Sequence, residues 1–344
     1  MARAHMAESG HTGDTVDGGS RAGSRAWRDR WGVRGPGIWR RGLVLAALAV
    51  LLALAMMLHA DIPNSVGNLG SLWETFLPWS GVPILLLLAG ALLRRSATAL
   101  IAVLLPLLVW ANLFAGQLTS KSGTGGDLTV VTHNVNAENL DPQGTAKALA
   151  ASGADVVALE EVTSKQADTF EKGLERSHRH HKLLGTVGLW SKYPMRDVRS
   201  VDLKMGWPRA MRATVRTPKG DVAVYVAHLP SVRVQFRSGF TAGKRDGSAA
   251  ALGYAIRHEK ADKIVLLGDL NGTMNDRSLS PITSQMRSVQ GAAGDGMGFS
   301  WPASFPMARI DQIMVKGATP VSAWSLPSTG SDHLPIAASV DLSD

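Results

Sequence analysis

The sequence lacks cysteine altogether, and this absence limits the chemistry that the 344-residue chain can perform. Disulfide bonds and thiolate metal sites are excluded, so any bound metal ion must be held by oxygen or imidazole ligands. Excess positive charge is also small outside the N-terminal tail. Residues 1–41 hold eight Arg and four acidic residues, which is half of the net charge of +8. The other four units belong to residues 121–344 and are too few to require a nucleic-acid partner, which we therefore do not expect.

Charged residues are nearly absent between residues 42 and 116, where three apolar runs predict transmembrane helices at 42–59, 77–93 and 97–115. The first run is uncharged, and as a helix it would cross about 27 Å of hydrocarbon. A cleaved signal peptide is the alternative for this run. Leu58 stands where cleavage favours a small side chain, and two further apolar runs follow, so we favour a retained span.

The placement of Lys and Arg predicts the orientation of these spans. Residues 1–41 and the turn at 94–96 carry Arg, whereas residues 60–76 carry neither Lys nor Arg. The sequence thus predicts a multi-pass protein of a bacterial cytoplasmic membrane, with residues 1–41 as a disordered, basic cytoplasmic tail. After a Ser/Gly/Thr-rich linker at 117–126, residues 127–344 form an extracytoplasmic domain next to the lipid bilayer.

Short β-type runs and helical stretches share the C-terminal domain, which predicts an α/β fold with a mixed sheet. The runs that predict strands are 128–135, 155–162, 188–191, 210–216, 221–228, 264–270, 310–315 and 335–342. The stretches that predict helices are 144–152, 164–175 and 244–259. Thr-Pro-Lys-Gly between two of the strands predicts a hairpin.

Polar side chains of a few types stand at the ends of these strands. They are His133, Asn134, Glu160, Glu161, His228, Asp269, Asn271, Asp311, Asp332 and His333. Any one of them is more often a solvated strand end than a functional residue, but six such ends together indicate a site. Carboxylate and amide oxygens suit a hard cation such as Mg²⁺, and oriented imidazoles suit the activation of water for attack on a phosphoryl group.

These signatures resemble those of the endonuclease/exonuclease/phosphatase superfamily, in the same order along the chain. The matching segments are His133-Asn134, Leu159-Glu160-Glu161, Ser191-Lys192-Tyr193-Pro194, His228-Leu229-Pro230, Gly268-Asp269-Leu270-Asn271, Arg309-Ile310-Asp311 and Ser331-Asp332-His333. The resemblance covers residues 127–342. It implies a four-layer, DNase I-like sandwich of two mixed sheets flanked by helices, preceded here by the three transmembrane helices.

The resemblance also implies roles for single residues. Asn134 and Glu161 would hold Mg²⁺, with Mn²⁺ as a possible substitute, while Glu160 replaces the Gln usual before the metal-binding Glu. Asp269 and Asn271 would orient the attacking water and the phosphate. His333, positioned by Asp332, would be the general base, and His228, paired with Asp311, would bind the phosphoryl oxygens.

The substrate is expected to be a phosphate or pyrophosphate ester at the outer membrane face, with Arg212, Arg233 and Arg237 as candidate substrate-binding residues. The whole chain resembles membrane-anchored VanJ-type teicoplanin-resistance proteins, which implies an undecaprenyl (polyprenyl) pyrophosphate or related cell-wall lipid as substrate, and glycopeptide resistance. The alternatives are an extracellular nuclease or sphingomyelinase-like phosphodiesterase, and, in another class, an inactive domain that binds or senses a lipid.

Overall fold

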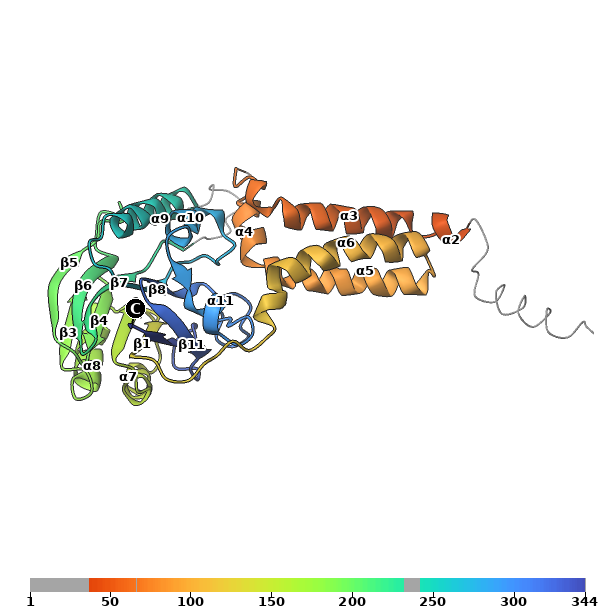
Figure 1. Ribbon diagram of the computed structural model, residues 1–344. Coiled ribbons are helices and arrows are strands. Elements are labelled where there is room, and N and C mark those ends of the chain that lie inside the picture. The colour runs from red at the N-terminus through yellow and green to blue at the C-terminus, as the bar shows by residue number, and fades with distance from the viewer. Residues whose placement is uncertain (1–36, 66, 232–241, 344) are drawn as a thin grey trace, which may run out of the picture. The chain divides into compact units, whose positions relative to one another are not determined.

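The computed structural model describes residues 37–343 except residue 66 and residues 232–241. Two compact units share the chain: Met1–Leu52 with Val82–Pro106, and Ala53–Gly81 with Leu107–Asp344. Most of the predicted cytoplasmic tail, together with Arg233 and Arg237, lies outside the described residues. Figure 1 shows the described elements along the chain.

The apolar runs form helices, but not all of these reach the length of a membrane span. The N-terminal part holds α2 (Gly37–Arg40), α3 (Leu43–Met57), α5 (Gly81–Leu93) and α6 (Ala97–Phe114). Among the described residues, only Ala97–Gln117 is long and apolar enough to cross a membrane as one helix, while α3 is shorter. A second span counts only if α4 (Leu69–Thr75) and the stretch Leu77–Leu93, which are bent against each other, are taken together. Three spans therefore remain a prediction.

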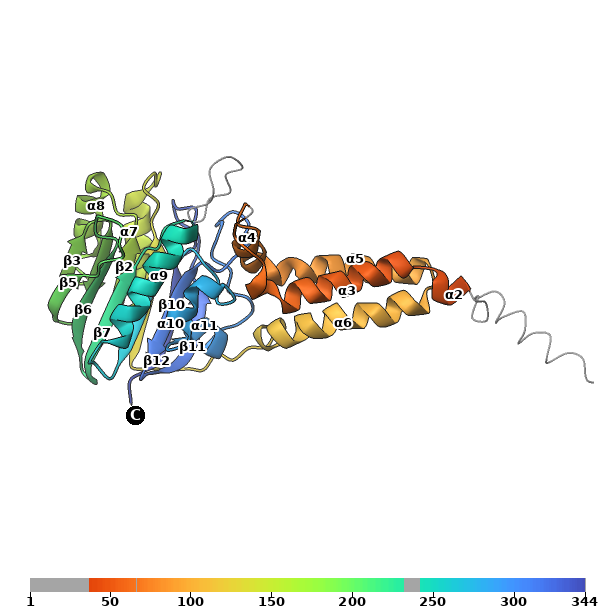
Figure 2. The same ribbon diagram turned by 90° about the horizontal axis from the view of Figure 1, so that it is seen from above.

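Two six-stranded sheets form the C-terminal domain (Figure 2). The first has the order β11-β12-β1-β2-β4-β3 and comprises β1 (Leu128–Asn134), β2 (Val156–Glu160), β3 (His180–Leu184), β4 (Val187–Ser191), β11 (Thr319–Ser325) and β12 (Ile336–Asp341). The second has the order β5-β6-β7-β8-β10-β9 and comprises β5 (Met195–Ser200), β6 (Ala210–Thr217), β7 (Gly220–Ala227), β8 (Ile264–Asp269), β9 (Arg287–Ser288) and β10 (Asp311–Lys316). The β1–β2 and β7–β8 pairs are parallel and the others antiparallel, so both sheets are mixed, as predicted.

Alternate residues of the central strands fill the spaces on either side of each sheet, as the two-residue period of a strand requires. Val130 of β1 and Val224 of β7 belong to the core between the sheets. Val131 of β1 belongs to a second core beneath the helices α7 (Pro142–Ala151) and α8 (Ser164–Leu174). Tyr225 of β7 belongs to a third core beneath α9 (Ala242–Arg257) and α10 (Ser280–Thr283). The result is the predicted four-layer arrangement of helices, two sheets and helices.

Strand edges and short helices were harder to predict than the central strands. The strands β3, β5, β9 and β11 were not predicted, and all four lie at sheet edges. Their outward residues are exposed and often charged, so they lack a clear apolar period. Three further short elements were also not predicted: η1 (His59–Asp61), which begins at the last residue of the first apolar run; α4, which lies between the first two runs; and η2 (Leu77–Ser80), which begins the run predicted as the span 77–93. All three belong to the same unit as the sandwich. The remaining short elements are η3 (Ala115–Gln117), η4 (Arg277–Leu279) and α11 (Val289–Ala293).

Candidate active site

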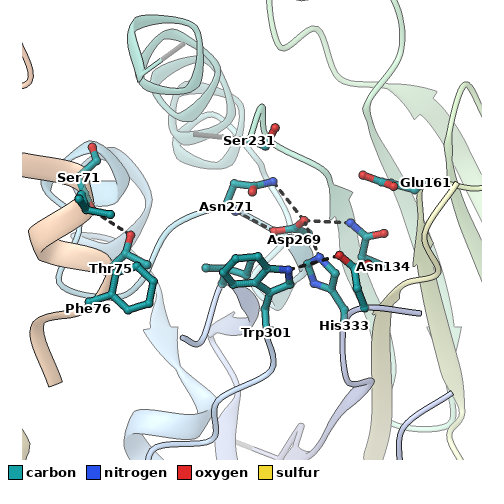
Figure 3. A pocket seen from close by; sticks show the side chains of 13 residues that line it. Ser71, Thr75, Phe76, Asn134, Glu161, Ser231, Asp269, Asn271, Trp301 and His333 are labelled. Atoms are coloured by element: carbon teal, nitrogen blue, oxygen red, sulfur yellow. Dashed lines mark hydrogen bonds and ion pairs between the residues drawn. The ribbon is translucent and has the colours of Figure 1, made fainter. Parts of the chain in front are cut away.

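The carboxyl ends of central strands from both sheets meet at one place (Figure 3). In the first sheet, β1 ends at Asn134, in register with Glu160 at the end of β2. In the second, Asp269 at the end of β8 pairs with Asp311 at the start of β10. A hydrogen bond from Asn134 Nδ2 to Asp269 Oδ2, 3.0 Å long, joins the two sheets. The predicted strand-end residues are therefore brought together by sheet packing.

Gly268 permits the close approach of two strands in this region. Its φ of 145° is rarely adopted by residues with a side chain, and a Cβ there would lie 1.9 Å from the carbonyl oxygen of Ala227 in β7. The glycine thus sets Asp269 directly beside the end of β7, where His228 follows.

His333 is held by Asp311. Its Nδ1 lies 2.9 and 3.1 Å from the two carboxylate oxygens of Asp311, which also accepts a 2.6 Å hydrogen bond from Ser300 Oγ. Both His333 and Asp311 are buried. Asp332 is exposed instead and accepts hydrogen bonds from Asn136 Nδ2 at 2.8 Å and Trp301 Nε1 at 3.4 Å.

The predicted pairing of His333 with Asp332 is therefore wrong, as is the pairing of His228 with Asp311. Residues 330–333 form a bend before β12, in which Asp332 is exposed while its neighbour His333 is buried. His228 lies with Nε2 3.6 Å from Glu161 Oε1 and 3.7 Å from Asp269 Oδ2.

His333 and His228 differ in charge at neutral pH. Burial by itself lowers the pKa of His333, but Asp311 and then Asp269 outweigh it and raise that pKa to about 10. Burial lowers the pKa of His228 well below its usual value, and the positive charges of Arg209 and His333 add to this effect. His333 is thus a cation and His228 a neutral imidazole.

Asp269 is the acid with the pKa best suited to proton transfer near neutral pH. Burial, followed by the nearby charge of Asp311, raises its pKa to about 7. Its carboxylate accepts hydrogen bonds from the backbone N–H of Asn271 at 2.9 Å and from Asn271 Nδ2 at 3.1 Å, in addition to the one from Asn134. Because all three bonds are donated to Asp269, its acceptor oxygens are fixed in direction.

Glu160 and Glu161 have different environments although they are neighbours. Glu160 is fully buried and accepts a 2.9 Å hydrogen bond from Thr132 Oγ1, and burial raises its pKa well above the usual value. The raised pKa favours the neutral form of Glu160, which is the form closest in charge to the Gln that usually precedes the metal-binding Glu in the resembling family. Glu161 turns away from the strand with a φ of 60°, and its side chain lines the pocket.

Two neighbouring groups of side chains offer ligands for a cation. Asn134 and Glu161, the predicted ligands, both line the pocket and provide an amide and a carboxylate oxygen, which suit a hard divalent ion. Asp269, Asp311 and His333 form a second group, buried, whose potential ligand atoms all lie within 4.8 Å of one another. In that group, however, His333 is protonated at neutral pH and cannot bind a metal ion in that form, so Asn134 and Glu161 are the better match.

The side chains at the strand ends open into a cavity of about 340 Å³, which lies within the second unit. Its lining consists of Ser71, Leu72, Thr75, Phe76, Asn134, Glu161, Ser231, Asp269, Asn271, Trp301, Ile310, Asp332 and His333. Seven lining residues were not among the predicted site residues: the four contributed by α4 and its C-terminal end, together with Ser231, Trp301 and Ile310. Six of the seven lie away from the predicted strand ends, and Ile310, which begins a predicted strand, is apolar, so no polar strand-end signal marks any of them.

Arg212 does not lie where it could bind the substrate, contrary to the prediction. Its guanidinium makes a two-pronged ion pair with Glu259, with distances of 2.9 and 3.1 Å, and it does not line the site cavity. Arg209 lies nearer to the site: its Nε donates a 3.0 Å hydrogen bond to the carbonyl of His228. Burial lowers the pKa of Arg209, although Asp269 and Glu161 act in the opposite direction. Positions 233 and 237 lie outside the described residues.

Comparison with solved structures finds the same fold in proteins of low sequence identity. A beta toxin from Staphylococcus aureus is 14% identical, with a TM-score of 0.51, over 62% of this chain and 99% of the toxin. The mannosyl-6-phosphatase Bt3783 of Bacteroides thetaiotaomicron is 15% identical, with a TM-score of 0.52, over 62% of this chain and 99% of that enzyme. D. rerio TDP2, in complex with a single-strand DNA product, is 16% identical, with a TM-score of 0.52, over 62% and 98%.

Comparison with curated protein sequences finds no match. Comparison with protein families, by contrast, matches residues 131–333 to the Endonuclease/Exonuclease/phosphatase family. The match spans more than half of the chain and includes every strand-end residue of the site described above. Enzymes of this family hydrolyse phosphoesters and generally use divalent metal ions. The chain is a member of the endonuclease/exonuclease/phosphatase family.

Proposed function

We propose that the protein is a membrane-anchored, Mg²⁺-dependent hydrolase of a lipid-linked phosphate or pyrophosphate ester, such as undecaprenyl pyrophosphate. The observation that carries this proposal is the continuous arrangement of Asn134, Asp269, His333 and Asp311, with Glu161 beside it, at one cavity. Such an arrangement combines oxygen ligands for a metal ion, a proton acceptor in Asp269 and a positively charged side chain in His333. Phosphoester hydrolysis requires groups of these kinds.

The Mg²⁺ ion would be held by Glu161 and Asn134, where its charge would stabilise negative charge on the phosphoryl oxygens. Asp269, with a pKa of about 7, accepts the proton of the attacking water. The water oxygen then bonds to phosphorus as the ester P–O bond breaks. His333, as an imidazolium, donates to a phosphoryl or leaving-group oxygen, with Asp311 fixing its ring. This division of roles is the reverse of the expected general-base role of His333.

The membrane location rests on the apolar helices. Most of the large apolar side chains that are exposed among the described residues belong to α3, α5 and α6, including Leu85, Leu86 and Leu93. A lipid environment would cover them. We propose three spans, an N-terminus in the cytoplasm and a catalytic domain outside, in accord with the Arg distribution. We also propose that hydrolysis of a cell-wall lipid carrier at that face confers glycopeptide resistance.

The decisive assay compares three substrates with the full-length protein in phospholipid vesicles. We expect release of inorganic phosphate from undecaprenyl pyrophosphate that is abolished by EDTA and restored by Mg²⁺ or Mn²⁺, and slow or no cleavage of plasmid DNA and sphingomyelin. Asp269→Asn should abolish release, whereas Asp262→Asn, a change at an exposed residue, should not.

Each alternative function has its own outcome in this assay. Faster cleavage of DNA or sphingomyelin would establish a phosphodiesterase instead. A protein of similar fold, D. rerio TDP2, has been solved with a single-strand DNA product. No turnover of any substrate, together with binding of the lipid, would establish the inactive lipid-binding domain.

A further inference from the structure

One wall of the site cavity comes from α4, which lies some 60 residues before the first residue matched to the family. Leu72 and Thr75 of α4, and Phe76 directly after it, face the strand-end residues across the cavity, and Figure 3 shows Thr75 and Phe76 opposite Asp269 and His333. Leu72 and Phe76 are four residues apart, so they lie on one side of the helical turn. This wall, which we call the α4 wall, consists of Ser71, Leu72, Thr75 and Phe76.

Buried ionic contacts hold the α4 wall against the sandwich. Arg245 of α9 is fully buried, and its Nη2 donates to Ser71 Oγ at 3.0 Å. The same guanidinium lies 2.7 Å from Asp276 and donates to the backbone carbonyl of Asn271 at 2.9 Å. A single buried cation therefore connects α4 to the backbone of a residue that orients Asp269. Breaking a buried ion pair is costly, so this connection is a stable part of the fold.

The contacts continue along the segment on both sides of the α4 wall. Thr273 Oγ1 donates to the carbonyl of Glu74 at 3.2 Å, and the backbone N–H of Arg277 donates to the Glu74 carboxylate at 3.4 Å. Beyond the wall, Trp79 Nε1 donates to the carbonyl of Met307 at 2.8 Å, and the Trp79 ring stacks on Phe299 with a centroid distance of 6.1 Å. The segment is thus fixed by contacts within the second unit.

The α4 wall gives the cavity two chemically different sides. One side carries Glu161, Asp269 and His333, whereas Leu72 and Phe76 provide hydrocarbon and an aromatic ring on the other. Leu72 remains 38% exposed, and Phe76 is only half-buried, so neither is needed to fill the protein core. Apolar surface left open beside catalytic carboxylates is typical of a site for a ligand that is itself part apolar.

We propose that the α4 wall is the subsite for the hydrocarbon chain of the substrate, next to the phosphoryl group, and that Leu72 and Phe76 determine specificity for long-chain esters. This inference rests on the proposed phosphoesterase function and makes it more specific. We infer a hydrocarbon chain as the ligand because the α4 wall and the strand-end residues line the same cavity. A chain that leaves the phosphoryl group on that side meets Leu72 and Phe76. Polar sugar-phosphate backbones would gain nothing from this surface.

The test compares two substrates with the same pyrophosphate group and different chains. Farnesyl pyrophosphate carries fifteen chain carbons and dimethylallyl pyrophosphate five, and both are assayed with the full-length protein in detergent micelles with Mg²⁺. We expect the wild type to have the higher kcat/KM for the longer chain. Phe76→Ala and Leu72→Ala should each lower kcat/KM for the longer chain by roughly 10- to 100-fold, mainly through KM, because a hydrophobic pocket discriminates by such factors. The shorter chain should be affected less than about threefold.

Leu69→Ala is the matched control, since Leu69 lies on the same helix, is 51% exposed and does not line the cavity. It should leave the ratio of the two kcat/KM values unchanged. Equal rates for both chains in the wild type, or an unchanged ratio in both Phe76→Ala and Leu72→Ala, would overturn the subsite but leave the phosphoesterase function standing. Absence of hydrolysis of both substrates, with the wild type folded, would overturn both. The exposed position of Leu72 means that its variant should fold even if Phe76→Ala does not.

Discussion

Replacement of Asp311 by Asn is the sharpest test of the site, because it separates the observed His333–Asp311 pair from the pairing expected from the sequence. Asn keeps the shape of the side chain but removes the charge that holds the His333 ring at 2.9 Å. The charge of Asp269, 4.0 Å from His333, remains. The pKa of His333 should then fall from about 10 toward its ordinary value of 6.5.

The stability of the folded protein should change in a pH-dependent manner. A histidine whose pKa is raised on folding stabilises the fold fully below the unfolded pKa of 6.5, and this stabilisation is lost as the pH rises through the folded pKa of about 10. We therefore expect the free energy of unfolding of the wild type to decline between pH 6.5 and 10, and that of Asp311→Asn to decline less. At pH 7 the variant should lose about 3 kcal/mol, the low end for a broken buried ion pair, because Asp269 still faces the ring.

Activity should fall along with stability. Loss of an oriented acid–base group costs roughly 10²- to 10⁴-fold in rate, so kcat should drop by that factor. The alkaline limb of the pH–rate profile should also move to lower pH, since a less basic His333 loses its proton earlier. Chemical denaturation at several pH values and a phosphate-release assay measure both effects.

Asp332→Asn is the matched control, since Asp332 precedes His333 in the sequence but is exposed and hydrogen-bonds to Asn136 and Trp301. It should leave the pH dependence of stability almost unchanged. A loss of kcat in Asp332→Asn equal to that in Asp311→Asn would refute the assignment, as would full activity in Asp311→Asn.

Three further predictions follow from the structure. Glu161→Gln should raise the Mg²⁺ concentration needed for half-maximal activity, because a charged ligand is lost. Glu160→Gln is the control and should leave that concentration unchanged. A change in Glu160→Gln alone would mean that Glu160, and not Glu161, binds the metal ion. Arg245→Ala should lower the free energy of unfolding by about 3–5 kcal/mol, since Asp276 is left buried without its partner. Arg257→Ala, a change at an exposed residue, should alter it by no more than about 0.5 kcal/mol. Equal melting temperatures of the two variants would contradict this prediction. An alkaline phosphatase fused to the C-terminus should be active and a fluorescent protein fused there dark, and the opposite pattern would refute the proposed topology.

The central strands and the site residues could be predicted because each depends on local sequence. Apolar runs such as Ile264–Leu267 stop at polar residues, and this abrupt change marks both a buried strand and the strand end that lines the cavity. The edge strands could not be predicted in the same way, because His180–Leu184 and Met195–Ser200 carry exposed charged residues and make no apolar period.

Pairings between side chains could not be predicted, because they depend on which strands pack together. Asp311 meets His333 only because β10 of one sheet faces the segment before β12 of the other. Arg212 illustrates the same limit, since its partner Glu259 follows α9, 47 residues further along the chain. Sequence proximity favoured Asp332 as the partner of His333, although in the bend at 330–333 Asp332 is exposed and His333 is buried.

Glu74, in the segment between the first two apolar runs, shows that the burial of a carboxyl group cannot be recognised from the sequence. Glu74 is fully buried, although a carboxylate next to apolar runs would be expected to face water. Burial, followed by the charge of Asp276, raises the pKa of Glu74 to about 8, so its carboxyl group is mainly neutral at pH 7. The backbone N–H of Arg277, more than 200 residues away, donates to this carboxyl group, and Thr273 donates to the backbone carbonyl of Glu74. These partners can be identified only in the folded domain. Because they fix α4 in the wall of the cavity, a change in the loop between the apolar runs should alter substrate choice without altering any residue of the family motifs.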